Sequence, residues 1–144
     1  MNISSILKAK GADIMTVRPT ETIQNAAMKL RIKGIGALIV SSDGITLDGL
    51  ITERAISDGV AVHGSGIGGL HVSDLMVTGV LTCRPQDSIA DAARLMTDRR
   101  LRHLPVMDGR RLVGIVSVGD ILKYRLDEVM LEAHVLQDMA LAQR

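Results

Sequence analysis

The sequence predicts a mixed α/β (α+β) fold in which two copies of a β-α-β-β-α unit pack pseudo-symmetrically around a shared core. Three observations lead to this fold class. The chain repeats itself over most of its length, and each copy alternates between helical and strand periodicity. Hydrophobic residues make up 47% of the 144 residues, with one Tyr and no Trp or Phe, so the core must be aliphatic. One unit this small cannot cover both faces of its own sheet, which favours pairing of the two copies.

The repeat is visible in the letters themselves. Residues 16–23 read TVRPTETI and residues 82–89 read TCRPQDSI, and a pair of alanines follows each stretch at the same distance. Further along, residues 47–52 (LDGLIT) match residues 112–117 (LVGIVS). Two copies of one unit therefore fill most of the chain.

Each copy is expected to open with an extended segment and a helix. The extended segments end at Pro19 and Pro85, because the residue before a proline is pushed toward the β region. Thr22 and Ser88 are placed to cap the helices that follow. Apolar residues then recur at helical spacing in both copies.

Two strands and a second helix are expected to complete each copy. Turn residues between apolar runs mark the strand pairs. The strands are predicted over residues 36–41 and 47–52, and over residues 104–107 and 112–117. The second helix is predicted to begin at Glu53 in the first copy and at Val118 in the second.

The domain organisation follows from these elements. We expect an N-terminal helix or cap over residues 1–12, a first repeat over 13–62, a glycine-rich linker over 63–72, a second repeat over 73–124 and a C-terminal amphipathic helix over 125–144. The C-terminal stretch carries apolar residues at alternating spacings of four and three, namely Leu122, Leu126, Val129, Ala133, Leu136 and Ala140. This stripe runs beyond the second repeat, so a second subunit is expected to cover it, and we expect a homodimer.

The order of elements and several motifs resemble the CBS domain, which usually occurs in tandem as a Bateman module. The motifs are DIMTVRP (residues 13–19), DLM (74–76), RHLPV (102–106) and GIVSVGDI (114–121). The resemblance covers about residues 13–124, and the combination is specific although no single piece is. The chain is similar to small bacterial proteins that consist of a CBS pair. This implies a regulatory binding module rather than an enzyme.

The resemblance also implies a ligand class. CBS pairs bind adenosine-containing ligands such as AMP, ADP, ATP, NAD(H) or S-adenosylmethionine in clefts between the repeats. A Ser/Thr-x-x-Asp/Asn motif after a strand contributes to each site: its hydroxyl and the helix N-terminus suit phosphate, and its carboxylate accepts the ribose hydroxyls. The second copy has Ser117 and Asp120 at these positions. The first copy has Thr52 and Ala55, so the two sites are expected to be unequal.

Residue by residue, the resemblance places two sites. The main ligand site would comprise Thr16, Thr20, Ile35, Gly36, Ala37, Ser117, Gly119 and Asp120. The second, degenerate site would comprise Thr82, Leu101, Arg102, His103, Thr52 and Arg54, and would be empty or would hold the phosphate end of a ligand centred in the first. A plainer alternative for Asp120 is that it only caps the helix after Ser117.

The expected function is a cytoplasmic adenine-nucleotide sensor that reports energy or redox state to a target protein by changing shape. The alternative is a protein-interaction scaffold whose clefts are vestigial. Ala55 favours this interpretation for one of the two clefts. A nucleotide hydrolase is the least favoured reading, because no general base accompanied by a metal site is apparent. No catalytic residues are therefore assigned.

Composition disfavours other classes. A net charge of +1 and the scarcity of aromatic rings argue against nucleic-acid binding. Four histidines without ligand spacing argue against a metal site. The absence of a long apolar run argues against a signal peptide or a membrane span, and one Cys with eight Met is typical of a cytoplasmic protein.

Two further features are interpreted as structural. Residues 64–69 (GSGIGG) match the dinucleotide fingerprint literally, but they follow a helix rather than a strand and are expected to form a flexible linker. Cys83 corresponds to Val17 of the first copy, which favours a small buried apolar residue over a nucleophile.

Overall fold

The computed structural model describes residues 1–11 and 14–143. Asp13, with which the first repeat was expected to open, lies outside the described residues, as do residues 12 and 144. The expected boundaries at these positions are therefore not described.

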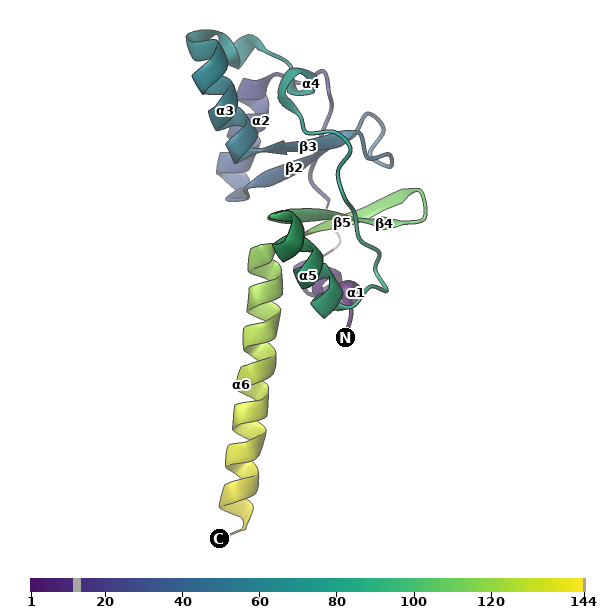
Figure 1. Cartoon of the computed structure of the whole chain (residues 1–144), viewed down its shortest axis with the longest axis vertical. Coiled ribbons are helices and arrows are strands. Elements are labelled where there is room, and N and C mark those ends of the chain that lie inside the picture. Colours follow the sequence, from purple (N-terminus) through teal and green to yellow (C-terminus); the bar gives the residue numbers. More distant parts are fainter. Residues whose placement is uncertain (12–13, 144) are drawn as a thin grey trace.

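The order of elements follows the predicted repeat closely (Figure 1). The helices are α1 (Ile3–Lys10), α2 (Ile23–Lys33), α3 (Glu53–His63), the 3-10 helix η1 (Gly64–Gly69), α4 (Val72–Leu75), α5 (Ile89–Arg99) and α6 (Val118–Ala142). The strands are β1 (Thr16–Val17), β2 (Ala37–Val40), β3 (Gly49–Thr52), β4 (His103–Asp108) and β5 (Arg111–Ser117).

Local capping explains where the long helices begin. The side chains of Thr22 and Ser88 accept hydrogen bonds from backbone N–H groups in the first turns of α2 and α5. Thr52 and Ser117 do the same for α3 and α6, which begin at the two predicted residues. Each cap pairs one of the donors that a helix start leaves without a partner inside the helix.

The first repeat is built on a three-stranded sheet. β2 lies in the centre, parallel to β1 and antiparallel to β3. All four residues of β2 are buried, which is the pattern of a strand covered on both faces. Its core is aliphatic, as expected, and includes Val17, Ile23, Leu38 and Ile51.

The second repeat is built on the β4–β5 hairpin. Its counterpart of β1 is reduced to a single parallel bridge between Cys83 and Val106. Its aliphatic core includes Ile89, Met96, Leu104, Val106 and Val116.

Each repeat is completed by a short helix from outside its own β-α-β-β-α unit. Ile3 and Ile6 of α1 are buried in the core of the second repeat, whereas Val72 of α4 is buried in the core of the first. The two helices are pseudo-equivalent, because Asn2 before α1 forms a bridge to Ser88 and His71 before α4 forms one to Thr22. Thus α1 precedes the first repeat in the chain but packs on the second, and α4 follows the first repeat and packs back on it.

The two sheets face each other across the middle of the molecule, with α2 and α3 on one side and α1 and α5 on the other (Figure 1). A third apolar cluster joins them, in which Ile39 and Leu50 of the first repeat and Leu112 of the second are buried. The pseudo-symmetric packing of two copies around shared apolar surface is confirmed.

The segment expected to be a flexible linker has a regular conformation. Residues 64–69 form η1, and Ile67 packs against the core of the first repeat. Gly59 permits this packing: a Cβ there would lie 2.7 Å from the Leu75 side chain and 2.9 Å from Ile67 Cδ1. The close approach is therefore made at Gly59 of α3, whereas a Cβ added at Gly64, Gly66 or Gly69 would meet no atom within 4 Å.

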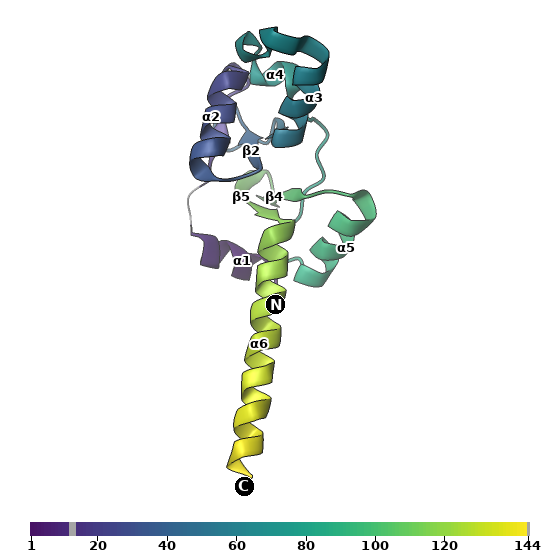
Figure 2. The same ribbon diagram turned by 90° about the vertical axis from the view of Figure 1, so that its left-hand side faces the viewer.

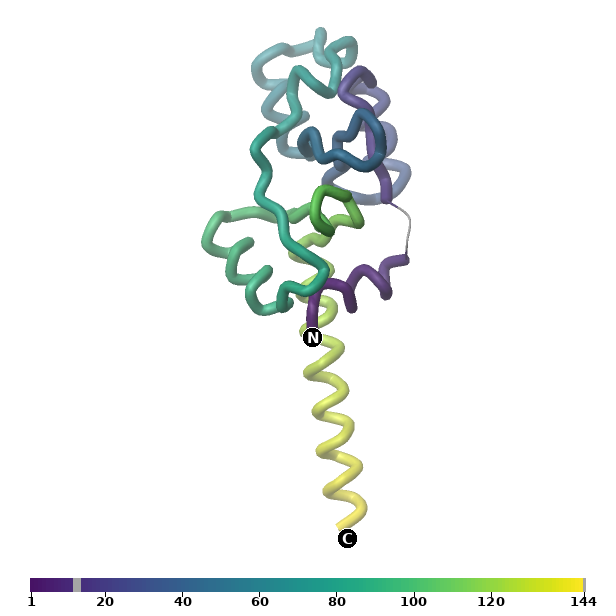
Figure 3. Tube along the Cα trace, turned by 90° about the vertical axis from the view of Figure 1, so that its right-hand side faces the viewer, coloured from purple at the N-terminus to yellow at the C-terminus, as the bar shows by residue number. Residues whose placement is uncertain are grey.

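The last helix projects from the globular part. α6 begins beside the second repeat, where Ile121 is buried, and then extends away as a single rod (Figures 1 and 2). α1 and α5 lie on opposite sides of its first turns (Figures 2 and 3). Beyond Ile121 its apolar side chains are largely exposed.

Candidate functional site

A cleft with a volume of about 1220 Å³ lies between the two repeats. The first repeat contributes Gly36, Leu50 and the start of α3, and Val77 and residues 79–81 form part of the wall. The second repeat contributes residues 99–103, at the end of α5, and residues 117–119, at the start of α6. A cleft of this size can hold a nucleotide.

Four arginines line this cleft: Arg54, Arg99, Arg100 and Arg102. Among the described residues of the lining, Glu53 is the only acidic one. The lining also includes the first residues of α3 and α6, and helix N-termini favour anions through their free N–H groups and dipoles. Charge and backbone geometry therefore both suit a ligand with several negative charges.

Arg100 is held in an unusual backbone conformation. Its φ of 54° lies in the left-handed region, where it ends α5. The corresponding residue after α2 is Gly34, with a φ of 64°. A side chain at such a position costs about 1 kcal/mol relative to glycine. Strain of this kind often accumulates at functional sites, and here it brings an arginine to the cleft.

His103 stands where the second repeat meets the first. A Cβ on Gly36 would lie 3.4 Å from the imidazole of His103, at van der Waals contact, so residue 36 and the ring lie side by side. Burial lowers the pKa of His103, and the charge of Asp120 acts in the opposite direction. The imidazole is therefore neutral at neutral pH and offers one donor and one acceptor.

Asp120 has two partners. Its Oδ2 accepts hydrogen bonds from the Ser117 backbone N–H at 2.9 Å and from Lys10 Nζ at 2.8 Å. Lys10 comes from α1 and also donates to the carbonyl of Ile115 at 2.8 Å. Burial alone would raise the pKa of Asp120, but the hydrogen bonds from Lys10 and Ser117 outweigh it and hold the pKa below its usual value.

The capping interpretation of Asp120 is thus seen in the structure. Ser117 Oγ accepts from the Asp120 backbone N–H at 3.1 Å, which with the reciprocal bond forms a capping box at the start of α6. The first repeat has no such box on α3, where Ala55 stands in place of the carboxylate and Thr52 caps alone. Capping uses one oxygen of Asp120 and does not exclude a ligand role.

The structure brings most residues of the second predicted site together. Five of its six residues line the cleft, namely Thr52, Arg54, Leu101, Arg102 and His103. Thr82 is exposed and lies next to the lining residue Leu81.

The main predicted site is divided. Gly36, Ser117 and Gly119 line the same cleft, whereas Thr16, Thr20, Ile35, Ala37 and Asp120 are outside its lining. Thr16 pairs in β1 with Ile39, and Ala37 is buried in β2. The Ile35 N–H, in the segment expected to meet the adenine edge, donates to the carbonyl of Leu30.

Sequence reasoning missed three charged residues of this region. Arg99 and Arg100 line the cleft, and Lys10 reaches Asp120 from α1. Arg100 could have been found by aligning the two repeats, because an arginine takes the place of Gly34 at a helix end. Lys10 gave no signal, since its position depends on how α1 packs on the second repeat.

Other site types find little support in the described part of the chain. Within residues 1–11 and 14–143, no three His, Cys, Asp or Glu side chains gather to hold a metal ion. The helices described include none both long and apolar enough to span a membrane. Cys83 is buried, and burial followed by the nearby charge of Asp87 raises the pKa of its thiol to about 11, so it is a poor nucleophile.

Comparison with known proteins identifies the family. The family described as CBS domain matches residues 7–61 and 72–127. The CBS domain-containing protein YhcV of Bacillus subtilis is 35% identical over 119 residues, which cover 83% of this chain and 84% of YhcV.

Solved structures agree with this assignment. The CBS-domain containing protein ATU1752 from Agrobacterium tumefaciens has a TM-score of 0.82 and 36% identity, over 87% of this chain and 99% of that one. CBSX2, solved in complex with AMP, has a TM-score of 0.72 and 26% identity, over 88% of this chain and 96% of that one. With a repeated fold, a cleft between the repeats and matches over both repeats, the chain belongs to the CBS domain family and is a CBS pair.

Proposed function

We propose that this CBS pair is a cytoplasmic regulatory module, not an enzyme, that binds an adenine nucleotide of the AMP, ADP, ATP or NAD(H) class. The ribose would lie at Asp120 and the phosphates would extend into the arginine-lined cleft. Binding would change the angle between the repeats and thereby report energy or redox state to a partner protein. The coupling is expected to be about 1–3 kcal/mol, as is typical of allosteric proteins.

The observation that carries this proposal is the cluster of four arginines beside two helix N-termini in one cleft between the repeats. Arginine binds phosphate oxygens in a bidentate manner, and helix N-termini add N–H donors. The complex of CBSX2 with AMP supports the ligand class, because that protein shares this fold.

The division of the predicted main site supports one ligand spanning two regions. Ser117 and Gly119 belong to the motif of Asp120, yet they line the arginine cleft together with Gly36. A nucleotide whose ribose is held at Asp120 would therefore have its phosphates within reach of this cleft. Lys10 would have to release the Asp120 carboxylate as the ribose hydroxyls take its place.

Calorimetric titration with adenosine, AMP, ATP and NADH tests the proposal. We expect binding by at least one nucleotide and weaker binding by adenosine, because adenosine has no phosphate to meet the arginines. The absence of heat and of a thermal shift with every ligand at millimolar concentration would refute it.

Two variants test the two halves of the site. Asp120→Ala is expected to weaken the binding of adenosine and of AMP equally. Arg102→Gln is expected to weaken the binding of AMP and to leave the binding of adenosine unchanged. Glu53→Ala is the matched control, because Glu53 lines the cleft but has no expected role in holding phosphate or ribose. Equal effects of Asp120→Ala and Glu53→Ala would argue against the site assignment.

The second candidate function is a protein-interaction scaffold with vestigial clefts. The ion pair between Lys10 and Asp120 favours it, because the carboxylate that would accept the ribose hydroxyls is already occupied. The alanine at position 55 favours it as well, because the first repeat has no carboxylate at the corresponding position. Protein purified without bound nucleotide and inert in the titrations would support the scaffold. In either case we propose that the chain acts as a homodimer and that a separate target protein reads its state.

A further inference from the structure

The part of α6 that projects from the second repeat exposes a continuous apolar stripe. Leu122, Leu126, Val129 and Leu136 are 62%, 61%, 60% and 67% exposed, and the stripe continues through Ala133 and Ala140. The spacings alternate between four and three, which places these residues at the a and d positions of heptads. A stripe of this kind on a single exposed helix calls for a second helix.

The charges beside the stripe indicate which helix fits it. Counting Leu126 as an a position, Arg125 and Glu132 are consecutive g positions. In an antiparallel pair of helices the g positions of one face the g positions of the other. One helix of this sequence therefore offers both charges that a second, identical helix would need.

Only one antiparallel register joins these charges. With Leu122 opposite Ala133 and Leu126 opposite Val129, Arg125 of each helix faces Glu132 of the other, and two-fold symmetry makes the contact twice. A shift of one heptad in either direction would place Arg125 against Arg125 or Glu132 against Glu132. Like charges at such positions are unfavourable.

Side-chain size selects the same arrangement. In the antiparallel register the large Leu122 meets the small Ala133, which fills the layer without a gap. In a parallel pair Ala133 would meet Ala133 and leave space, Arg125 would face Met130, and Glu132 would face Gln137. The parallel pair therefore gains no charge contact and packs less well.

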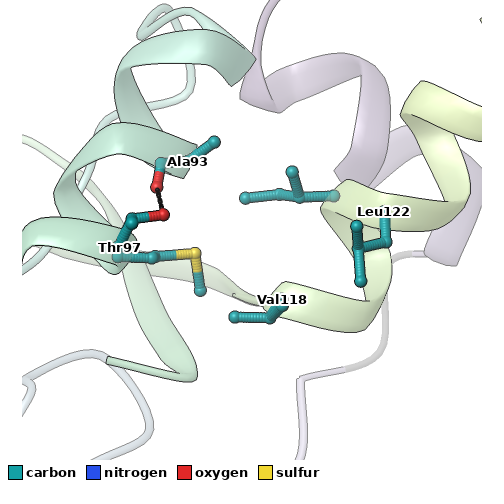
Figure 4. A pocket seen from close by; sticks show the side chains of 6 residues that line it. Ala93, Thr97, Val118 and Leu122 are labelled. Carbon is teal, nitrogen blue, oxygen red and sulfur yellow. Dashed lines mark hydrogen bonds between the residues drawn. The ribbon is translucent and has the colours of Figure 1, made fainter. Parts of the chain in front are cut away.

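A notch at the base of α6 fits this register. It has a volume of about 160 Å³ and is lined by Ala93, Met96 and Thr97 of α5 and by Val118, Ile121 and Leu122 of α6 (Figure 4). Its lining is predominantly apolar side chains, and the Thr97 hydroxyl is turned to the Ala93 carbonyl, to which it donates at 2.9 Å. In this register Val118 and Met139 of the second copy are facing g positions, as Arg125 and Glu132 are, so Met139 lies near one of the residues that line the notch.

We propose that two copies of this chain pair through α6 as an antiparallel coiled coil, with Leu122 opposite Ala133 and reciprocal contacts between Arg125 and Glu132. The inference rests on the homodimer of the proposed function, and its tests need no nucleotide. It fixes how two modules are held: the globular parts lie at opposite ends of the paired helices.

Charge reversal tests the register. Arg125→Glu alone would face Glu132, and Glu132→Arg alone would face Arg125, so each single variant is expected to weaken the dimer about ten-fold in sedimentation equilibrium. The double variant restores opposite charges and is expected to recover the wild-type dimer. Glu128→Gln is the control for the 3.9 Å ion pair that Arg125 makes within its own helix, and it is expected to leave the dimer unchanged.

Disulfide trapping tests the direction. Leu122→Cys alone is expected not to cross-link to itself, whereas an equimolar mixture of Leu122→Cys and Ala133→Cys proteins is expected to cross-link under mild oxidation. The buried Cys83 serves as background, and unaltered protein is expected to stay uncrosslinked. The substituted residues Leu122, Arg125, Glu132 and Ala133 are all exposed on α6, so circular dichroism is expected to show an intact fold.

Three results would overturn the proposal. A wild-type chain that stays monomeric at the highest attainable concentration would refute the homodimer itself, whether or not nucleotide binds. A dimer in which Leu122→Cys cross-links to itself would refute the antiparallel direction. A double charge variant that dimerises no better than the single ones would refute the register.

Discussion

The ion pair between Lys10 and Asp120 gives the sharpest test of how α1, the second repeat and the ligand site are connected. The perturbation is Lys10→Met, which removes the ammonium but keeps a long apolar stem. Lys10 Nζ lies 2.8 Å from Asp120 Oδ2, and the two side chains are 37% and 23% exposed. Solvent screens a pair this exposed, so its contribution to the free energy of unfolding is about 1 kcal/mol.

The magnitude is best measured as a coupling. Unfolding by urea of wild type, Lys10→Met, Asp120→Asn and the double variant forms a double-mutant cycle. Asp120→Asn alone is expected to cost about 1–2 kcal/mol, because it also weakens the helix cap with Ser117. The coupling between the two sites is expected to be about 1 kcal/mol, and a coupling near zero would refute the pairing.

The pH dependence has a definite sign. The pKa of Asp120 in the folded protein lies below its usual value, so the unfolded chain takes up the proton first as pH falls. The stability that Asp120 provides is therefore complete above the usual carboxyl pKa and is lost as pH falls below about 4. The difference in unfolding free energy between wild type and Asp120→Asn is expected to shrink over that range. A difference that stays constant would contradict the reasoning.

The same perturbation bears on binding. A ribose whose hydroxyls donate to Asp120 must first displace Lys10, so Lys10→Met is expected to bind adenosine up to about five-fold more tightly, the equivalent of 1 kcal/mol. Calorimetry with adenosine rather than AMP isolates this effect from any contact between Lys10 and phosphate. Unchanged or weaker adenosine binding would show that Lys10 does not compete with the ligand.

Three further predictions follow from the packing and the cleft. Ile3→Ala is expected to cost about 2–4 kcal/mol in urea unfolding, because Ile3 is fully buried in the core of the second repeat, whereas a change below about 0.5 kcal/mol would show that α1 is not part of that core. Arg100→Gly is expected to raise the unfolding free energy by about 1 kcal/mol, because glycine relieves the strain of the positive φ. The same variant is expected to weaken AMP binding in calorimetry, and tighter AMP binding would show that Arg100 is not part of the site. The Cys83 thiol, with its pKa raised to about 11 by burial and by Asp87, is expected to react with a thiol reagent only after unfolding, and rapid reaction of native protein at neutral pH would contradict its burial.

Features set by local chemistry could be predicted from the sequence. The starts of α3 and α6 depend on Thr52 and Ser117 as caps, and both helices begin where expected. The strand pairs depend on apolar runs between turn residues, and they agree to within a few residues. The repeat itself predicted the pseudo-symmetric pairing, because each half has the same sheet to cover.

Features set by packing between distant segments could not be predicted. Nothing in the sequence of α1 shows that Ile3 packs into the second repeat or that Lys10 reaches Asp120. The glycine-rich residues 64–69 were expected to be flexible, but Ile67 anchors them to the first repeat. Of the residues predicted for the second site, all except Thr82 line the cleft, whereas Arg99 and Arg100, which supply two of its four arginines, were marked by no motif.

The most direct test of the proposed function is a crystal structure of the chain grown with ATP or AMP. The proposal predicts the ribose hydroxyls on Asp120, Lys10 moved away from that carboxylate, and the phosphates beside Arg100 and Arg102. A nucleotide bound elsewhere, or crystals in which the Lys10–Asp120 contact persists and the cleft stays empty at saturating ligand, would contradict it.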